Sequence, residues 1–381
     1  MGALSGVRVL DLSGGIAGPL GVRQLAEHGA DVIKIEPVGG RADRTSPASR
    51  AYNRSRRSVT LNLKDQDGVK VLRDLCATAD VLVEAYAAGT MATLGLDYET
   101  LRVDCPRLVY CSVPAWPSGV RYDDRPGYEA LVHARTGQQW EVTSSRPGPV
   151  FLHSPVASLA ASLLVPTGIM AALLARESTG RGQHVEVSLL QGVMSLTTQI
   201  WNWTDQGQFL LAKSHPPGIH QESIYECANG EWIHAATTTG GAPTRTQEAI
   251  LGLEEVDVPT HPGMPPEERA LHEMRKKEAY KRLDRSAVIE ELRAAGLNAE
   301  AIVAPHERFE HAQLLDTGAV VDVADPELGS LTQVGMTIFL EGTPGEVTGP
   351  QPLPGAHTGE VLLELGRTPD EIAALRASGV I

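Results

Sequence analysis

Two patterns of apolar and polar positions alternate along residues 7–113. Short apolar runs end at polar turns, and the stretches between them repeat apolar residues at the spacing of a helix. A strand, a helix and a strand in that order are typical of a βαβ unit, whose strands lie parallel. The runs predicted as strands are residues 7–12, 32–35, 59–63, 80–84 and 108–113. We therefore expect an open α/β sheet that binds its ligand at the carboxyl ends of the strands.

A long apolar stretch covers residues 157–177. It is apolar on nearly all sides, which predicts an interior helix rather than a surface helix. Residues 178–182 break the pattern, and residues 184–189 alternate as a strand does. The stretch contains Pro166 and is too short to span a membrane, so no transmembrane helix is expected. Ser158 lies in the first helical turn, where a side chain can be held rigidly beside a ligand.

The pattern changes after Trp201, and the remaining chain predicts a second, smaller domain. Residues 202–222 are typical of a linker, and residues 223–304 predict an α+β domain. That domain contains a hairpin around Asn229 and Gly230, a charged helical stretch over residues 266–295 and a strand over residues 298–304. Residues 305–381 are loop-rich until two final helices, and we expect them to return to the large domain formed by residues 1–201.

Composition narrows the classes of partner. The 381 residues carry a formal net charge of -14, which disfavours nucleic acid and anionic membranes, since both need a basic face. The four cysteines have neither paired nor metal-type spacing, so we expect a cytoplasmic protein without a metal. They are Cys76, Cys105, Cys111 and Cys227.

Several motifs in order along the chain resemble those of family III CoA-transferases. They are GVRVLDLS followed by IAGP, GADVIKIEP, RRSVTLNLK, TGRGQHVEVSLL and PGAHTGEVLLELG. The family includes formyl-CoA transferase, carnitine CoA-transferase and the α-methylacyl-CoA racemases. The resemblance implies a Rossmann-like large domain built from both ends of the chain, a smaller α+β domain, and two chains interlocked as a dimer.

The resemblance also implies a catalytic aspartate, and this chain has Ser158 at that position. In the family the aspartate takes the acyl group from CoA as an anhydride, which an acceptor acid then opens. A serine gives a less reactive ester and needs a base to become nucleophilic. His153 is one candidate for that base. In the other interpretation, Ser158 only caps the helix or lines the pocket.

Other site residues are implied by the same resemblance. Tyr128 and Glu129 match a tyrosine and glutamate that line the family's pocket, although Tyr128 could equally be a packed aromatic residue. Because Tyr128 replaces the histidine of the racemases, racemisation is disfavoured. Gly240 and Gly241 resemble a glycine loop that closes over the substrate, and the alternative for them is a plain turn.

The expected CoA site has lost two cations that the family carries, because Ala87 and Thr93 stand at their positions. Arg56 and Arg57 could hold the CoA phosphates, or could be solvated loop arginines. The remaining candidate CoA ligands are Ala17, Arg41, Leu61 and Lys64.

Two functions remain open. In the first, the chain is an acyl-CoA transferase with altered chemistry, acting as a homodimer on an acyl-CoA thioester and a carboxylic acid. In the second, it is a non-catalytic subunit or binding protein that forms a heterodimer with an active paralogue. A third, weaker possibility is that it binds some other small molecule.

Overall fold

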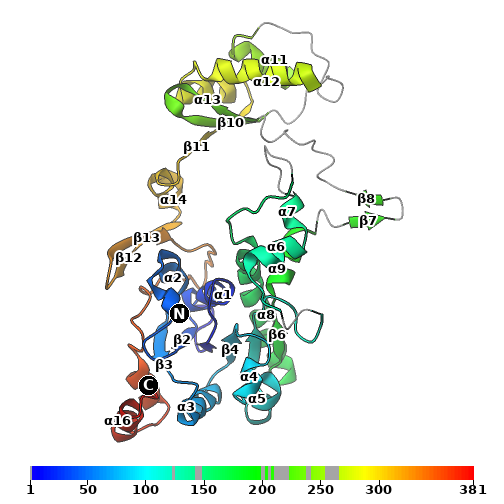
Figure 1. Cartoon of the computed structure of the whole chain (residues 1–381). Coiled ribbons are helices and arrows are strands. Elements are labelled where there is room, and N and C mark those ends of the chain that lie inside the picture. The colour runs from blue at the N-terminus through cyan, green and yellow to red at the C-terminus, as the bar shows by residue number, and fades with distance from the viewer. Residues whose placement is uncertain are drawn as a thin grey trace. The chain divides into compact units, whose positions relative to one another are not determined.

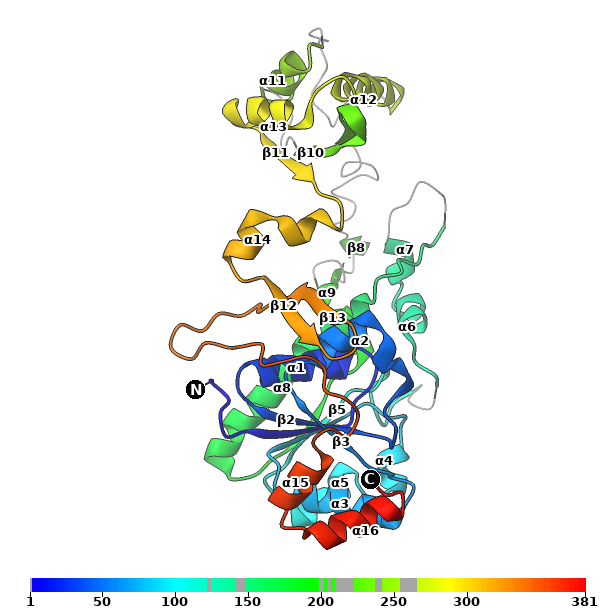
Figure 2. The ribbon, with the colours of Figure 1, turned by 90° about the vertical axis from the view of Figure 1, so that its left-hand side faces the viewer.

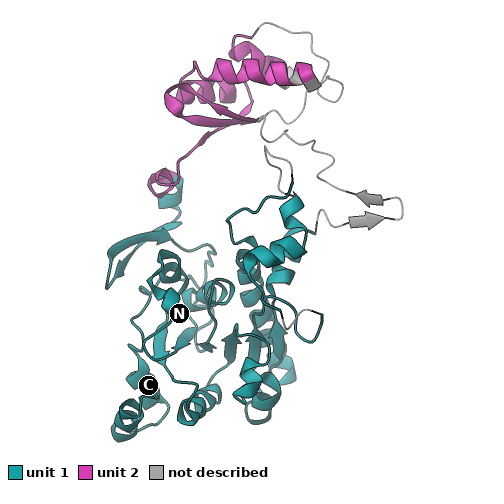
Figure 3. Cartoon of the chain, viewed as in Figure 1, with its two compact units in different colours: residues 1–202, 313–381 teal, residues 203–312 magenta. Residues whose placement is uncertain are grey.

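The structure is a computed structural model that describes residues 2–121, 125–141, 148–198, 202–204, 207–209, 223–236, 242–253 and 266–381. Contacts within the chain divide it into two compact units (Figure 3). Unit 1 comprises residues 1–202 and 313–381, and unit 2 comprises residues 203–312. Each unit is described by itself.

Unit 1 is built on a six-stranded parallel sheet with the order β3-β2-β1-β4-β5-β6 (Figure 1). The strands are β1 (Arg8–Asp11), β2 (Asp31–Glu36), β3 (Arg57–Thr60), β4 (Val81–Glu84), β5 (Val109–Ser112) and β6 (His184–Glu186). The chain runs outward from β1 in both directions, so the order reverses between β1 and β4. Ligands of open α/β sheets bind at such a reversal. The predicted α/β fold with a large parallel sheet is confirmed.

Helices cover both faces of this sheet (Figure 2). Helices α1 (Ala17–Glu27) and α8 (Val156–Thr179) pack on one face, where the core includes Val9, Val81 and Ile169. The other core contains Leu10, Leu72 and Val361 and lies under α3 (Gln66–Cys76), α5 (Tyr98–Asp104), α15 (Thr358–Glu364) and α16 (Pro369–Ala377). Neighbouring strand residues such as Val9 and Leu10 belong to opposite cores because side chains alternate across a strand.

Unit 1 also contains several shorter helices. They are α2 (Pro47–Tyr52), α4 (Thr90–Thr93), α6 (Glu129–Arg135), α7 (Gln138–Glu141) and α9 (Leu189–Leu196). Among the described residues, α8 is the one helix long and apolar enough to cross a membrane by length and composition. Half of its apolar window is buried in the structure, so the predicted interior helix is only partly covered within this chain.

Three local predictions differ from the structure in extent or continuity. The strand expected over residues 184–189 ends at Glu186, because Ser188 and Gln191 form a capping box that starts α9. The helical stretch over 266–295 is two helices, α12 (Pro266–Tyr280) and α13 (Arg285–Ala294), and Asp284 caps the second. The loop-rich segment after residue 305 contains a hairpin of β12 (Val320–Asp325) and β13 (Gly329–Val334), whose turn includes Pro326.

Unit 2 has a three-stranded antiparallel sheet with the order β11-β10-β9. The strands are β9 (Ile224–Glu226), β10 (Trp232–Ala236) and β11 (Asn298–Ile302), and α11 (Ala242–Ile250) joins α12 and α13 in this unit. Tyr225 and Tyr280 stack in its core with ring centroids 4.3 Å apart. Of the predicted linker, residues 205–206 and 210–222 lie outside the described residues.

Candidate active site

A cavity of about 810 Å³ lies in unit 1 at the carboxyl ends of β1, β4 and β5. We call it the unit 1 cavity. Its walls are residues 14–18 after β1, residues 85–88 after β4, residues 113–116 after β5 and residues 125–129, with Arg41 and Ser158. The volume is in the range of small-molecule sites, and the location is the reversal of strand order where such folds bind ligands.

Ser158 and Glu129 meet at one wall of this cavity. The Ser158 hydroxyl donates a hydrogen bond of 2.7 Å to Oε2 of Glu129. The backbone N–H groups of Ala157 and Ser158 donate to the two oxygens of the same carboxylate, at 2.5 Å and 3.1 Å. These N–H groups belong to the first turn of α8, where helical N–H groups have no partner within the helix and favour a negative charge. The glutamate therefore caps α8 from a neighbouring helix.

His133 lies one turn along α6 from Glu129, and its ring is close to the Glu129 carboxylate. Its Nε2 is 2.9 Å from Oε1 of Glu129, although the ring N–H is not aligned for a hydrogen bond. The ring is buried and packs edge-on against Phe151 at 5.7 Å between centroids. Sequence reasoning missed His133, but the spacing of four residues on one helix was the signal that could have found it.

The other two expected catalytic residues differ in their surroundings. Tyr128 lines the cavity and is 71 % exposed, so its ring is not a packed core aromatic. His153 is exposed and is not a lining residue of the unit 1 cavity, and its ring contacts Phe151. The Ser158 hydroxyl points to Glu129 instead.

The candidate CoA ligands separate into two groups. Ala17 and Arg41 line the cavity, as does Ala87. Arg41 lies directly over Gly14, where a Cβ atom would collide with the guanidinium group. Among the described lining residues, the charged side chains are Arg41, Arg125 and Glu129.

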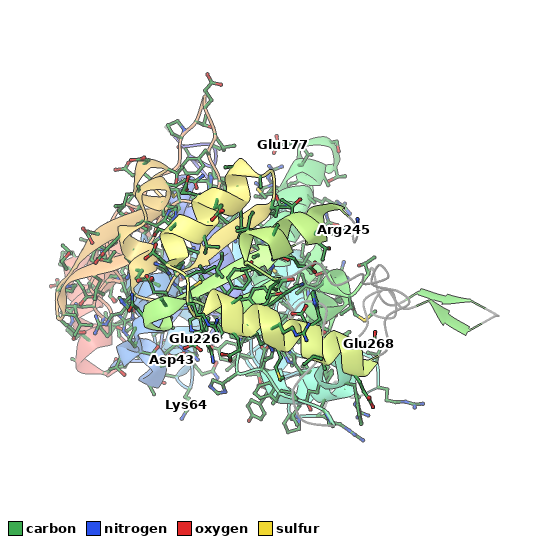
Figure 4. All side chains as sticks on the ribbon, turned by 90° about the horizontal axis from the view of Figure 1, so that it is seen from above. Asp43, Lys64, Glu177, Glu226, Arg245 and Glu268 are labelled. Atoms are coloured by element: carbon green, nitrogen blue, oxygen red, sulfur yellow. The ribbon has the colours of Figure 1, made fainter. Side chains whose placement is uncertain are left out.

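Arg56, Arg57, Leu61 and Lys64 do not line this cavity. Arg56 is fully buried and pairs with Asp11 at 2.6 Å, and Leu61 is a buried core residue. Arg57 binds Asp31 and Glu364, at 2.7 Å and 2.6 Å. Burial opposes the charge on Arg57, but these carboxylates outweigh it and raise the pKa of the guanidinium. Lys64 is exposed at the surface (Figure 4).

The partner of Arg56 belongs to a buried charged cluster that sequence reasoning missed. Lys34 donates to Oδ2 of Asp11 at 3.0 Å and also to the carbonyl oxygen of Ser13. Asp11 accepts from both the N–H and the hydroxyl of Ser13, at 2.8 Å and 2.5 Å. Burial raises the pKa of the Asp11 carboxyl, but Lys34 and Arg56 outweigh that effect and hold it below its usual range. The cluster holds the start of the loop that lines the cavity.

Gly240 and Gly241 lie outside the described residues. Ser112 connects two further titratable groups near β4 and β6, since its hydroxyl is 2.9 Å from Nε2 of His184 and also bonds Glu84. Burial raises the pKa of the Glu84 carboxyl. Glu84 accepts the N–H of Tyr86 at 2.8 Å and so shapes the cavity wall after β4.

The family model for CoA-transferase family III matches residues 4–358. The chain belongs to CoA-transferase family III. The membership predicted from the sequence motifs is thus confirmed.

Relatives named for CoA transfer cover nearly the whole chain. A succinyl-CoA:glutarate CoA-transferase of Mus musculus is 29% identical over 100% of this chain and 91% of its own length. A formyl-CoA:oxalate CoA-transferase of Streptomyces avermitilis is 29% identical over 100% and 99%. The β subunit of a succinyl-CoA–L-malate CoA-transferase of Chloroflexus aurantiacus is 29% identical over 99% and 98%.

Solved structures show the same fold. A CAIB/BAIF family protein from Brucella suis has a TM-score of 0.83 at 24% identity, covering 96% of this chain and 99% of its own. Rv3272 from Mycobacterium tuberculosis has a TM-score of 0.78 at 23% identity, covering 94% and 99%.

Proposed function

We propose that this member of the family takes an acyl-CoA thioester into the unit 1 cavity and passes the acyl group to Ser158, with Glu129 as the base. The observation that carries the proposal is the 2.7 Å hydrogen bond from the Ser158 hydroxyl to Oε2 of Glu129 at the cavity wall. A nucleophilic hydroxyl needs a base within this distance.

Glu129 is better placed as a base than as a nucleophile. Each of its oxygens already accepts a backbone N–H from the first turn of α8, and Oε2 also accepts the Ser158 proton. The same donors fix the carboxylate in one orientation, which general-base catalysis requires. The proposal therefore replaces the family's aspartyl anhydride with a serine ester.

Arg41 is the proposed ligand for an anionic part of CoA, with the backbone around Ala17 beside it. Both line the cavity. Arg56 and Arg57 are not proposed as phosphate ligands, because their guanidinium groups are already bound to carboxylates of the chain. Tyr128, exposed at the rim, is proposed to contact the acyl group.

The first test is covalent. The purified chain is incubated with acetyl-CoA or succinyl-CoA, and its intact mass and tryptic peptides are measured. We expect an acyl adduct on Ser158 that Ser158→Ala removes. The matched control is Ser162→Ala one turn further along α8, because Ser162 is buried, donates to the Leu159 carbonyl at 2.6 Å and does not line the cavity. An adduct on Glu129 that hydroxylamine converts to a hydroxamate would contradict serine as the carrier.

A Ser158→Asp variant measures how far the site has departed from the family's pattern. It restores the carboxylate that the resemblance implies, and we expect it to gain exchange of CoA onto added carboxylic acids. Mass spectrometry of the thioester products detects that exchange. If the wild-type chain already exchanges CoA faster than this variant, the ester mechanism is wrong.

A second candidate function is a non-catalytic subunit paired with an active paralogue. It is favoured by Ala87 in the cavity wall, where the resemblance expects a cation for CoA. Calorimetric titration with CoA separates the two functions. Binding without any adduct or thioester cleavage supports the second function, whereas binding with cleavage supports the first.

We also propose that the chain is a homodimer of the interlocked type. Leu163, Met170 and Leu174 of α8 are 59 %, 45 % and 75 % exposed, which is unusual for a stripe of large apolar residues. Light scattering over a range of protein concentrations tests this proposal. We propose a reducing, cytoplasmic location as well, supported by four cysteines that are all free and buried.

A further inference from the structure

We infer a further activity for this site: the chain hydrolyses acyl-CoA thioesters, with water as the final acceptor of the acyl group. The inference rests on the proposed function, because it starts from the acyl ester on Ser158. It concerns what removes the acyl group.

The geometry of Glu129 supplies a place for the water. Once Ser158 Oγ carries an acyl group, it no longer donates a proton to Oε2 of Glu129. That oxygen keeps its bond from the Ser158 N–H, and Oε1 keeps its bond from the Ala157 N–H. The carboxylate thus stays in place with one acceptor position open. Its side chain is 19% exposed and lines the cavity, so water can reach that position beside the ester.

The two steps balance with the chain's own groups. In the first step, Glu129 takes the proton of Ser158, the Oγ–carbon bond forms, and the carbon–sulfur bond breaks. The departing thiolate takes the proton from Glu129 and leaves as the free thiol. In the second step, Glu129 takes a proton from water, whose oxygen bonds to the acyl carbon while the carbon–Oγ bond breaks. Ser158 then recovers the proton, so one thioester and one water give one carboxylic acid and one thiol.

The ester itself favours water over an acceptor acid. A carboxylate that attacked the ester would have to form an anhydride, which lies well above an ester in free energy. Water converts the same ester to an acid in a downhill reaction. The family's aspartyl carrier avoids this problem because an anhydride is exchanged for another anhydride. With Ser158 as its carrier, the acyl group therefore passes to water even if an acceptor acid can still enter the cavity.

The cavity wall gives a second, independent reason. Transfer to an acid requires the CoA thiol to stay bound until the new acyl group arrives. Residues 85–88 are Ala-Tyr-Ala-Ala, so CoA phosphates meet no cationic side chain at this wall, and the cationic side chains among the described lining residues are those of Arg41 and Arg125. Each missing charge-assisted hydrogen bond weakens retention of an anion. Early loss of the thiol leaves the acyl ester in the cavity with water.

The experiment measures thiol release from acetyl-CoA without any added acid, in water enriched in ¹⁸O. We expect steady thiol release, one ¹⁸O atom in the product acid, and little new thioester when succinate is added. Glu129→Gln should slow release by about 10²- to 10⁴-fold, the usual contribution of general acid–base catalysis, and Ser158→Ala should slow it at least as much. Ser162→Ala should leave the rate unchanged.

The outcomes separate the two proposals. If an acyl adduct forms on Ser158 but persists without releasing acid, the hydrolysis inference fails and the proposed function stands. If added acid is converted to its CoA thioester faster than water is consumed, hydrolysis is overturned, and exchange faster than that of Ser158→Asp overturns the ester on Ser158 as well. If neither an adduct nor free thiol appears although CoA binds, the proposed function fails as well. Circular dichroism of each variant confirms that a lost rate is not a lost fold.

Discussion

Two polar clusters in unit 1 differ in how their charged groups are partnered. In the cluster of Asp11, Lys34 and Arg56, each charged group binds others inside the protein, and the three side chains are 0 to 3% exposed. At the N-terminus of α8, Glu129 also accepts hydrogen bonds from the Ser158 N–H and hydroxyl. In contrast to the first cluster, Glu129 and Ser158 line the cavity. Whether a charged side chain stabilises the fold or is available to a ligand depends on its burial and its partners rather than on its residue type.

This difference separates two arginines that were both expected to bind CoA. Arg56 lies in an arginine-rich loop. Its guanidinium donates hydrogen bonds to Asp11 and to the backbone carbonyls of Pro19 and Tyr52. Arg41 makes a longer contact of 3.3 Å with exposed Asp43 and faces the cavity. An ion pair in the interior is costly to break, whereas an exposed pair yields its cation to a ligand with little loss.

The largest effect is expected from Asp11→Asn. It leaves the buried charges of Lys34 and Arg56 without their shared carboxylate, so the free energy of unfolding should fall by about 3–5 kcal/mol. Urea denaturation measures the change. Asp31→Asn is the matched control on β2, where the side chain is 34% exposed, and it should cost about 1 kcal/mol or less. Equal losses from both variants would show that burial does not make the Asp11 ion pairs more important for stability than the exposed ion pairs of Asp31.

The next effect is expected from Arg41→Ala, which acts on binding rather than on stability. Loss of a charged hydrogen bond to CoA should cost about 1.5–3 kcal/mol, or about 10- to 100-fold in Kd. Calorimetry with CoA measures this change. The control is Arg44→Ala, because Arg44 binds Glu36 at 2.5 Å and is not a lining residue of the cavity. Unchanged affinity in Arg41→Ala would exclude Arg41 as the ligand.

A smaller effect on the free energy of unfolding is expected when the pH is lowered. Burial raises the pKa of Asp325, but bonds from the Glu327 N–H and from Arg50 outweigh it and lower the pKa. A carboxyl with a lowered folded pKa stabilises the fold above its unfolded pKa, and this contribution is lost as the pH falls through the folded pKa. Stability should therefore decline below about pH 4, and Asp325→Asn should flatten that decline. A variant with the same acid profile as the wild type would contradict this assignment.

The smallest effect is expected at Gly14. A Cβ at this position collides with the guanidinium of Arg41, whose flexible end can move aside. Gly14→Ala should therefore weaken CoA binding several-fold, by about 1 kcal/mol, and leave the unfolding midpoint unchanged. Calorimetry beside thermal melting measures both quantities. A lower midpoint with unaltered affinity would show that Gly14 serves the fold and not the site.

The periodicity of the sequence predicted the elements of unit 1 well because each is encoded locally. The strands of the sheet are short apolar runs, and α8 is apolar over most of its length with Gly180 ending it in the left-handed conformation. The β12–β13 hairpin was not predicted because its strands alternate weakly and its stability comes in part from distant contacts. Arg50 on α2 binds Asp325 at 2.7 Å, across 275 positions of the chain.

The sequence by itself determined the family and the order of strands and helices in unit 1. The tertiary structure decided which charged side chains are available for chemistry. Lys34 and Arg56 lie in segments that look solvent-facing or strand-like, and only the parallel pairing of β1, β2 and β3 brings them to Asp11. Ser158 and Glu129 are 29 positions apart, and the acceptor of the Ser158 hydroxyl is identified only because α6 meets the first turn of α8. The physical reason is that a hydrogen bond depends on distance in space, which local periodicity does not encode.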